Sequence, residues 1–223
     1  MGSDVPKQFL LLDGKPILHH TLAVLEQCPL VDEVVLVVSE REVTQAQKLQ
    51  DSYHKVIRSI VGGKERQDSV YNGWRSLDPA TDIVVVHDGV RPFVSPDLIR
   101  ETIEAARELG AVITAIPVSD TLKKVSADGR VEATIDRSGL WRVQTPQTFR
   151  YSLLGEAYQK ARADGFYGTD EGSLIEHLGA EVKVIPGSEL NIKITRVEDL
   201  VLGEKIAALV KTNRPGARVE SLP

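Results

Sequence analysis

Residues 136–149 carry an unusual density of hydrogen-bonding side chains. They include two arginines, two threonines and two glutamines around one proline and one tryptophan. The stretch also alternates in the manner of a β-strand, and guanidinium groups bind the oxygens of phosphates and carboxylates. The sequence therefore predicts a strand at an edge that binds an anionic, oxygen-rich ligand.

A second polar group follows an aliphatic run. Asp88, Gly89 and Arg91 come directly after the apolar residues 83–86. An aspartate at the end of a strand is well placed to meet a metal ion, a ribose hydroxyl or a phosphate-bound cation. It can equally cap a turn while Arg91 pairs with it. Gly89 lets the backbone approach a ligand closely. Both interpretations of Asp88 stay open at this point.

The stretch 62–70 places two glycines between a predicted strand and a predicted helix. Gly63, Arg66 and Ser69 belong to it. Backbone N–H groups at a Gly-rich loop and a helix start favour anions and the hydrogen-bonding edges of bases. The spacing matches neither a Walker loop nor a dinucleotide fingerprint. Taken alone, it is also compatible with a flexible turn and an ordinary helix cap.

Two lysines have unusual neighbours. Lys7 stands between Pro6 and an apolar run, where it is either solvated or fixed against a phosphate as a point charge. In the predicted strand 191–195, Lys193 shares one face with an asparagine and a threonine, and two isoleucines form the other. This strand is either a plain amphipathic edge or the polar lining of a pocket, with Lys193 on a phosphate.

Strands and helices alternate along most of the chain. The predicted strands are 34–38, 55–61, 83–87, 111–116 and 182–185. The predicted helices are 16–27, 40–52, 67–76, 95–109, 151–163, 170–178 and 197–211. This order predicts an α/β fold with a doubly wound, mostly parallel, Rossmann-like sheet. In such sheets ligands bind beyond the carboxyl ends of the strands.

Residues 120–149 interrupt this alternation. Residues 121–125 and 130–136 read as strands around a turn at Asp128-Gly129, which predicts a projecting β-hairpin arm. A hairpin that leaves a doubly wound domain must pack against something, and a partner subunit is the simplest answer. We therefore expect one domain over 1–211 that includes the arm at 120–149, a homodimer, and a loose tail over 212–223.

Composition limits the function classes. With 27 basic and 32 acidic residues the net charge is −5, which disfavours nonspecific binding to nucleic acid or membrane surfaces. No apolar run is long enough to span a membrane. Cys28 is the single cysteine, which predicts a core residue, a reducing compartment and hence a cytoplasmic location. The five histidines show no metal-ligand spacing.

Taken together, the sequence resembles the 2-C-methyl-D-erythritol 4-phosphate cytidylyltransferases of the non-mevalonate isoprenoid pathway. The matching blocks occur in the family's order and span nearly the whole chain. They are PKQF at 6–9, LDGKPIL at 12–18, GGKERQDSV at 62–70, HDGVRPF at 87–93, DT at 120–121, DRSGLWRVQTPQTF at 136–149, TDEGS at 169–173 and NIKIT at 191–195.

The resemblance implies a nucleotidyltransferase fold and a role for each candidate residue. Methylerythritol phosphate attacks the α-phosphate of CTP, giving CDP-methylerythritol and pyrophosphate. Mg²⁺ is required and is held mainly by the CTP phosphates, with no metal ligand expected from the protein. The arm reaches across a homodimer, so that Thr121 and Arg137 serve the neighbour's site. The implied catalytic residues are Lys7, Arg137 and Lys193; the nucleotide-binding residues are Gly63, Arg66, Ser69 and Asp88; and the substrate-binding residues are Asp88, Arg91, Thr121, Arg137, Thr145 and Lys193.

The chain departs from the family pattern at its first residues. Family members begin with a strand and a Gly-rich loop of the form Pro-Ala-Ala-Gly-x-Gly-x-Arg-Met, and the sequence opens at Met1-Gly2, where that motif ends. That loop holds the CTP phosphates. We therefore expect little activity and weak stability from a chain that starts at Met1.

Two other functions stay open. A ribitol-5-phosphate cytidylyltransferase shares the fold and the PKQF, DT and NIKIT-like blocks, although the Arg-Ser-Gly-Leu-Trp run at 137–141 favours methylerythritol phosphate. The other is a noncatalytic nucleotide-binding homologue, which would bind cytidine nucleotides without releasing pyrophosphate.

Overall fold

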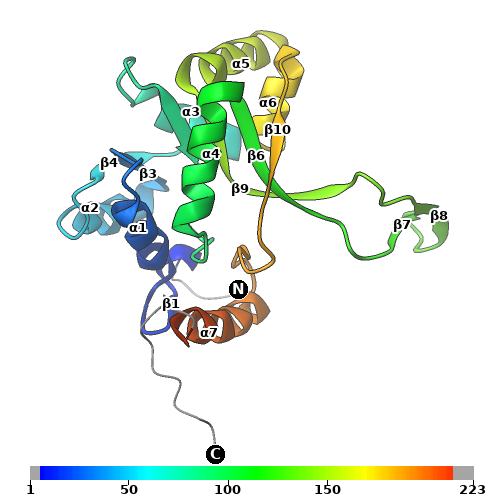
Figure 1. The fold of residues 1–223 in the computed structure, drawn as a ribbon, viewed down its shortest axis with the longest axis horizontal. Coiled ribbons are helices and arrows are strands. Elements are labelled where there is room, and N and C mark those ends of the chain that lie inside the picture. Colours follow the sequence, from blue (N-terminus) through cyan, green and yellow to red (C-terminus); the bar gives the residue numbers. More distant parts are fainter. Residues whose placement is uncertain (1–5, 213–223) are drawn as a thin grey trace, which may run out of the picture.

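The computed structural model describes residues 6–212 (Figure 1). Its strands are β1 (Leu11–Leu12), β2 (Lys15–Pro16), β3 (Val34–Val38), β4 (Val56–Val61), β5 (Ile83–Val86), β6 (Ala111–Pro117), β7 (Leu122–Val125), β8 (Val131–Ile135), β9 (Trp141–Arg150) and β10 (Lys183–Pro186). Its α-helices are α1 (Ile17–Gln27), α2 (Val43–Gln50), α3 (Arg66–Arg75), α4 (Pro96–Leu109), α5 (Tyr151–Asp164), α6 (Glu171–Leu178) and α7 (Val197–Thr212). Short 3-10 turns cover Lys7–Phe9 and Glu40–Glu42.

Most elements predicted before residue 120 and after residue 150 are present within a few residues of their expected ends. The exception is the predicted strand 191–195, which is not a strand. The expected tail at 212–223 lies outside the described residues apart from Thr212, the last residue of α7. Met1-Gly2, where the family's Gly-rich loop would end, also lies outside them. Over residues 6–212 the structure contains no helix long and apolar enough to cross a membrane.

The main sheet is mixed, which corrects the expectation of a mostly parallel one. It has the strand order β10-β6-β9-β5. β10 runs parallel to β6, but β9 runs antiparallel to both β6 and β5. The cause is the connection between β6 and β9. Pro117, at the end of β6, pairs with Trp141, at the start of β9, so the chain returns beside the strand that it has just left.

Residues 147–149 of β9 pair with β5 and with β6, so this part of the stretch 136–149 lies inside the sheet and does not form the edge expected from the sequence, whereas residues 141–144 pair with β6 alone. Gln144, Thr145, Gln147 and Thr148 are buried between neighbouring elements. Polar side chains placed there need internal partners, because a buried group without a hydrogen bond is costly. The Gln147 side chain accordingly donates to Asp170 at 2.8 Å and accepts from the backbone of Gly172 at 3.1 Å.

Helices cover both faces of the main sheet (Figure 1). On one face α4 packs against β6 and β9. Its start is defined by Ser95, whose hydroxyl accepts from the Leu98 N–H at 3.1 Å, and by Pro96 in the first turn. On the other face α5 and α6 bury Phe149, Leu154 and other apolar side chains in a separate core cluster.

β3 and β4 form a second, parallel sheet of two strands. Among residues 6–212, no strand pairs with the other edge of β3 or with the outer edge of β5. A cavity of about 890 Å³ lies between β3 and β5, and every residue of these two strands lines it. The alternation of strands and helices along the sequence does not predict that β3 and β5 belong to two separate sheets.

β7 and β8 pair in antiparallel register, with Leu122 opposite Ile135. Figure 1 shows this hairpin extending away from the rest of the described chain. Every residue of β8 is exposed, and Val131 and Trp141 keep 62% and 42% of their surface accessible. A two-stranded hairpin with so little packing is marginal on its own, and its apolar side chains stay accessible in this structure.

Candidate active site

Three charged side chains meet where β5 ends. The Asp88 carboxylate lies 3.2 Å from Nε of Arg91 and 3.1 Å from Nζ of Lys193. Burial by itself raises the pKa of Asp88, but Lys193, Arg91 and Arg66 together hold that pKa below its usual value. Asp88 is therefore ionised at neutral pH. Of the two sequence interpretations of Asp88, its pairing with Arg91 is confirmed, and Lys193 joins the pair.

The segment that carries Lys193 is held in place by its backbone. Ile194 donates its N–H to the Val90 carbonyl at 2.9 Å, and Arg91 donates to the Asn191 carbonyl at 2.7 Å. Asn191 and Ile194 are fully buried, whereas Lys193 is exposed. The predicted two-faced strand was wrong because Asn191 faces the protein interior. Its amide donates to the Thr145 carbonyl at 2.9 Å.

Thr145 and Arg91 are supports in this cluster. Both are buried, with 4% and 9% of their surface accessible, and neither lines the large cavity. The Thr145 hydroxyl accepts from the Asp88 N–H at 3.0 Å and also contacts His87 at 3.0 Å. The resemblance assigned both residues to the substrate. The pairing of Arg91 with Asp88 was an open alternative in the sequence, whereas the internal partners of Thr145 were not predicted.

The Gly-rich loop joins β4 to α3. Gly63 donates its N–H to the Ser69 hydroxyl at 3.0 Å, and that hydroxyl donates to the Glu65 carbonyl at 3.1 Å. A Cβ at Gly63 would lie 2.3 Å from Cβ of Asp68, so the loop closes over the helix start only with glycine there. Gly63 and Ser69 therefore stabilise the conformation of the loop itself.

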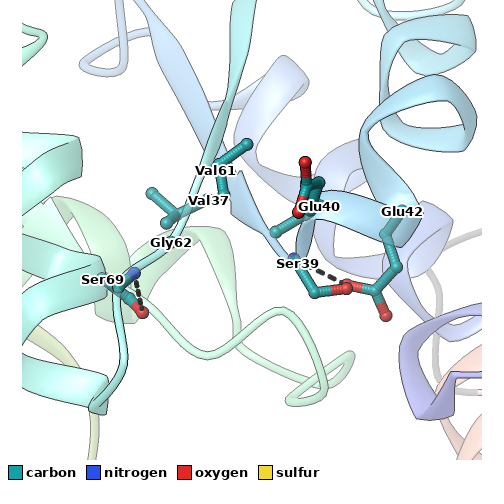
Figure 2. Close-up of a pocket in the computed structure, with 9 residues that line it drawn as sticks. Val37, Ser39, Glu40, Glu42, Val61, Gly62 and Ser69 are labelled. Atoms are coloured by element: carbon teal, nitrogen blue, oxygen red, sulfur yellow. Dashed lines mark hydrogen bonds between the residues drawn. The ribbon is translucent and has the colours of Figure 1, made fainter.

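A smaller pocket of about 330 Å³ opens beside this loop (Figure 2). Figure 2 shows Ser39, Glu40 and Glu42 on one side and Ser69, Gly62 and Val37 on the other. Ser39 donates its N–H to the Glu42 carboxylate at 2.9 Å. The pocket lies beyond the carboxyl ends of the parallel pair β3–β4, where an α/β sheet places its ligands.

Arg66, at the start of α3, is fixed by a residue that sequence reasoning gave no role. It forms two contacts with the Glu171 carboxylate, at 2.9 and 2.8 Å. Glu171 keeps 1% of its side chain accessible, and burial raises its pKa although Arg66 opposes that shift. The signal in the sequence was an acidic residue in the TDEGS block, where α6 begins.

One cavity brings several of the candidate residues together. Arg66, Ser69, Asp88 and Lys193 all line the large cavity, and Ser69 also lines the smaller pocket with Gly63. Lys7 is exposed in the 3-10 turn and lines neither, although its neighbour Gln8 lines the large one.

Two candidate residues lie beside the β7–β8 hairpin. Thr121 and Arg137 are exposed, and Arg137 donates to the Ser119 carbonyl. Neither residue lines the large cavity or the smaller pocket.

The comparisons identify the family. The family model of 2-C-methyl-D-erythritol 4-phosphate cytidylyltransferase matches residues 1–208. The chain belongs to this family. A family member from Syntrophus aciditrophicus is 48% identical over 207 residues, which are 92% of this chain and 88% of that protein. One from Geotalea uraniireducens is 44% identical over 219 residues, 96% of this chain and 94% of that protein.

Solved structures of cytidylyltransferases have the same fold. The 4-diphosphocytidyl-2C-methyl-D-erythritol synthase of Anaerococcus prevotii is 34% identical and superposes with a TM-score of 0.84, covering 93% of this chain and 92% of its own. The 2-C-methyl-D-erythritol 4-phosphate cytidylyltransferase of Thermus thermophilus is 32% identical, with a TM-score of 0.77 and coverage of 91% and 94%. The α/β nucleotidyltransferase fold is therefore shared along nearly the full chain.

Proposed function

We propose that this chain transfers CMP from CTP to 2-C-methyl-D-erythritol 4-phosphate. A phosphate oxygen of the polyol bonds to the α-phosphorus, the bond from that phosphorus to the bridging oxygen breaks, and pyrophosphate leaves. The observation that carries the proposal, beside family membership, is the shared cavity. Arg66 and Ser69 line it from the Gly-rich loop side, and Asp88 and Lys193 line it from the β5 side.

The proposed roles follow from charge and place. Phosphoryl transfer needs reactants in line and positive charge on the nonbridging oxygens, and it needs no protein nucleophile. Gly63, Arg66 and Ser69 would frame the nucleotide, with Asp88 on its hydroxyls or on those of the polyol. Lys193 would hold the polyol phosphate, and Lys7 would stabilise charge on the α-phosphate from its exposed 3-10 turn.

Mg²⁺ would enter with the CTP phosphates. Within residues 6–212 no group of three His, Cys, Asp or Glu side chains is arranged to hold a metal ion. The Asp88 carboxylate already pairs with the cationic side chains of Arg91 and Lys193, which disfavours the binding of a metal cation there as well. The described residues do not form a metal cage, so we assign no step to the ion through the protein.

We propose that the enzyme is a cytoplasmic homodimer built through the arm, with residues 1–211 as one catalytic unit. The arm offers exposed apolar side chains such as Val131 and Trp141, which a second copy could cover. Thr121 and Arg137 would then act in the neighbour's site. The buried single cysteine is compatible with a reducing compartment.

Mixed dimers test the arm. Arg137→Lys should lose roughly tenfold to a hundredfold in turnover, because a point charge does not replace a bidentate fork. Dimers that combine an Arg137 variant with a Lys7 variant should recover part of the activity, since one of the two sites is then intact. An absence of any recovery would count against action in trans.

The test of the function is pyrophosphate release from CTP and Mg²⁺. We would assay the chain as given, and a version extended upstream through an apolar strand and a Gly-rich loop, with methylerythritol phosphate and with ribitol 5-phosphate. Release with methylerythritol phosphate supports the proposal. Release with ribitol phosphate alone identifies the other cytidylyltransferase. Cytidine nucleotide binding without release in both versions identifies a noncatalytic homologue.

A further inference from the structure

His87 connects the two strands that position the charged cluster. It follows β5, is partly buried and lines the large cavity. Its Nε2 lies 3.2 Å from the carbonyl oxygen of Arg91, and its Nδ1 lies 3.0 Å from the hydroxyl of Thr145 on β9. The ring therefore contacts both the turn that presents Asp88 and the strand opposite that turn.

The proton positions around His87 follow from its partners. A carbonyl oxygen only accepts, so Nε2 must carry the proton and donate to Arg91. In the neutral ring Nδ1 then accepts, and the Thr145 hydroxyl donates to it. That hydroxyl still has lone pairs, and it accepts from the Asp88 N–H at 3.0 Å. Every donor in this chain of bonds has one acceptor.

These bonds fix the geometry of the cluster. Asp88 is held at its N–H by Thr145, and Arg91 is held at its carbonyl by His87. The Arg91 guanidinium in turn lies 3.2 Å from the Asp88 carboxylate, which lies 3.1 Å from Lys193. A change at His87 would therefore move both ends of the turn relative to Lys193.

We propose that His87 is a positioning residue for the charged cluster of Asp88, Arg91 and Lys193, acting through Thr145 and the Arg91 carbonyl. The inference rests on the proposed function and adds a residue to it. His87 acts in the neutral form, with the proton on Nε2. The ring exchanges no proton with substrate.

The surroundings of the ring agree with a neutral form. Burial lowers the pKa of His87 to about 4, against the raising effects of the Arg91 carbonyl and Asp88. A proton on Nδ1 would point at the Thr145 hydroxyl and leave the hydroxyl hydrogen without its acceptor. The bonding pattern and the low pKa therefore favour the same protonation state.

Two amide replacements separate the two contacts. His87→Asn places a polar atom near Nδ1 and keeps an acceptor for Thr145, whereas His87→Gln reaches the Nε2 position and keeps a donor for Arg91. His87→Ala keeps neither. We expect His87→Ala to lower kcat/KM for the polyol phosphate about tenfold to a hundredfold. The two amide variants should fall between His87→Ala and the unmodified enzyme, and KM for CTP should change less than about twofold in all three.

A double-mutant cycle tests the route through Thr145. If His87 acts through that hydroxyl, the losses from Thr145→Val and His87→Ala should not add: the double variant should lose less than the two single losses combined, because both changes remove the bond between the ring and the hydroxyl, while Thr145→Val alone also removes the acceptor of the Asp88 N–H. The matched control is His19→Asn. His19 is a partly buried histidine of α1 that also bonds a hydroxyl, that of Tyr53, and it lies outside the large cavity. This control should leave kcat/KM unchanged.

Three results would overturn the proposal. The first is unmodified kinetics in His87→Ala. The second is a KM that rises equally for CTP and for the polyol phosphate in His87→Ala, which would indicate a general defect in folding. The third comes from ¹⁵N NMR of the unmodified enzyme, where we expect a neutral ring protonated on Nε2 between pH 6 and 8. A proton on Nδ1, or titration near the ordinary histidine pKa of about 6.5, would contradict it.

The NMR measurement needs no turnover. Its outcome is therefore distinct from a failure of the proposed function, in which no polyol phosphate supports pyrophosphate release.

Discussion

On one side of the large cavity, β5 belongs to a four-stranded sheet with helices on both faces, whereas on the other side β3 pairs only with β4 among residues 6–212. The β5 side also carries the denser polar network. Asp88, Arg91, Thr145 and Asn191 are tied to one another by short hydrogen bonds. The Gly-rich side depends on loop contacts and on the pair of Arg66 with Glu171.

From this difference we infer that the two sides of the cavity bind different substrates. The polyol phosphate would bind charged side chains that the four-stranded sheet already holds in place. These side chains would lose little conformational entropy when the ligand binds. The nucleotide would meet a loop and a helix start on the smaller sheet. Since the two sheets face each other across the cavity, their relative placement decides whether the reactants align.

Joining the two sheets should have the largest effect. An upstream extension with one apolar strand and a Gly-rich loop should fill the cavity between β3 and β5, because the edges of both strands that face it have no partner among the described residues. Burying about five apolar side chains, less the entropy of ordering them, should raise Tm by roughly 10 °C. Thermal unfolding measures this.

The control for the extension is a Gly/Ser segment of equal length, which should leave Tm unchanged. Equal Tm for the strand extension and this control would show that the cavity does not accept a strand.

A charge removed from the β5 side comes next. Lys193→Ala should lower kcat/KM for the polyol phosphate about a hundredfold to a thousandfold, because a positioned cation on a phosphate is lost. Its side chain is 41% accessible, so the fold should be retained. Lys183→Ala, an exposed lysine on β10, is the matched control. Unchanged kinetics would exclude Lys193 from the site.

A change on the Gly-rich side should affect the other substrate. Glu171→Gln removes the charge that holds Arg66, so we expect KM for CTP to rise about tenfold while KM for the polyol phosphate changes little. Steady-state kinetics with each substrate varied in turn measures this. Glu176→Gln, an exposed residue of the same helix, is the control. An equal change for both substrates would mean that the two sides do not act separately.

The last prediction concerns pH, and its effect is confined to acid conditions. The folded pKa of His87 is about 4, below the unfolded value of about 6.5. The unfolded chain therefore binds more protons, and stability is full above pH 6.5 and falls as the pH drops towards 4. The loss should reach about 3 kcal/mol at pH 4. Urea unfolding of the enzyme and of His87→Asn measures it. An equal pH dependence in both would contradict this assignment.

The sequence predicts the strands and helices outside residues 120–149 because their hydrophobic periodicity is local. It does not predict the direction of β9, since the hairpin between β6 and β9 reverses the chain without changing that periodicity. The Lys193 segment fails for a related reason. Alternation suggests a two-faced strand, yet Asn191 turns inward to reach the Thr145 carbonyl, a contact made 46 residues away in the chain.

Asp88 and Lys193 were candidates in the sequence, and the structure places both in the lining of the large cavity, while their roles stay predictions. The supporting residues Glu171 and His87 were not predicted from the sequence. Glu171 and His87 act through partners far apart in sequence, Arg66 for the first and Thr145 for the second. No local pattern marks such pairs, because their distance is set only when the sheet and helices have packed.

The position of β9 has a consequence for how the gene can change. Residues 141–144 and 147–149 pair with β6, and residues 147–150 pair with β5. One inserted or deleted codon there would therefore shift the register of the strand and turn Thr145 away from His87. Residues 127–130 of the turn are exposed, and the backbone bonds of this turn join Ser126 to Gly129 and Arg130. Length variation among natural relatives should therefore accumulate at the tip of the hairpin and be absent from β9.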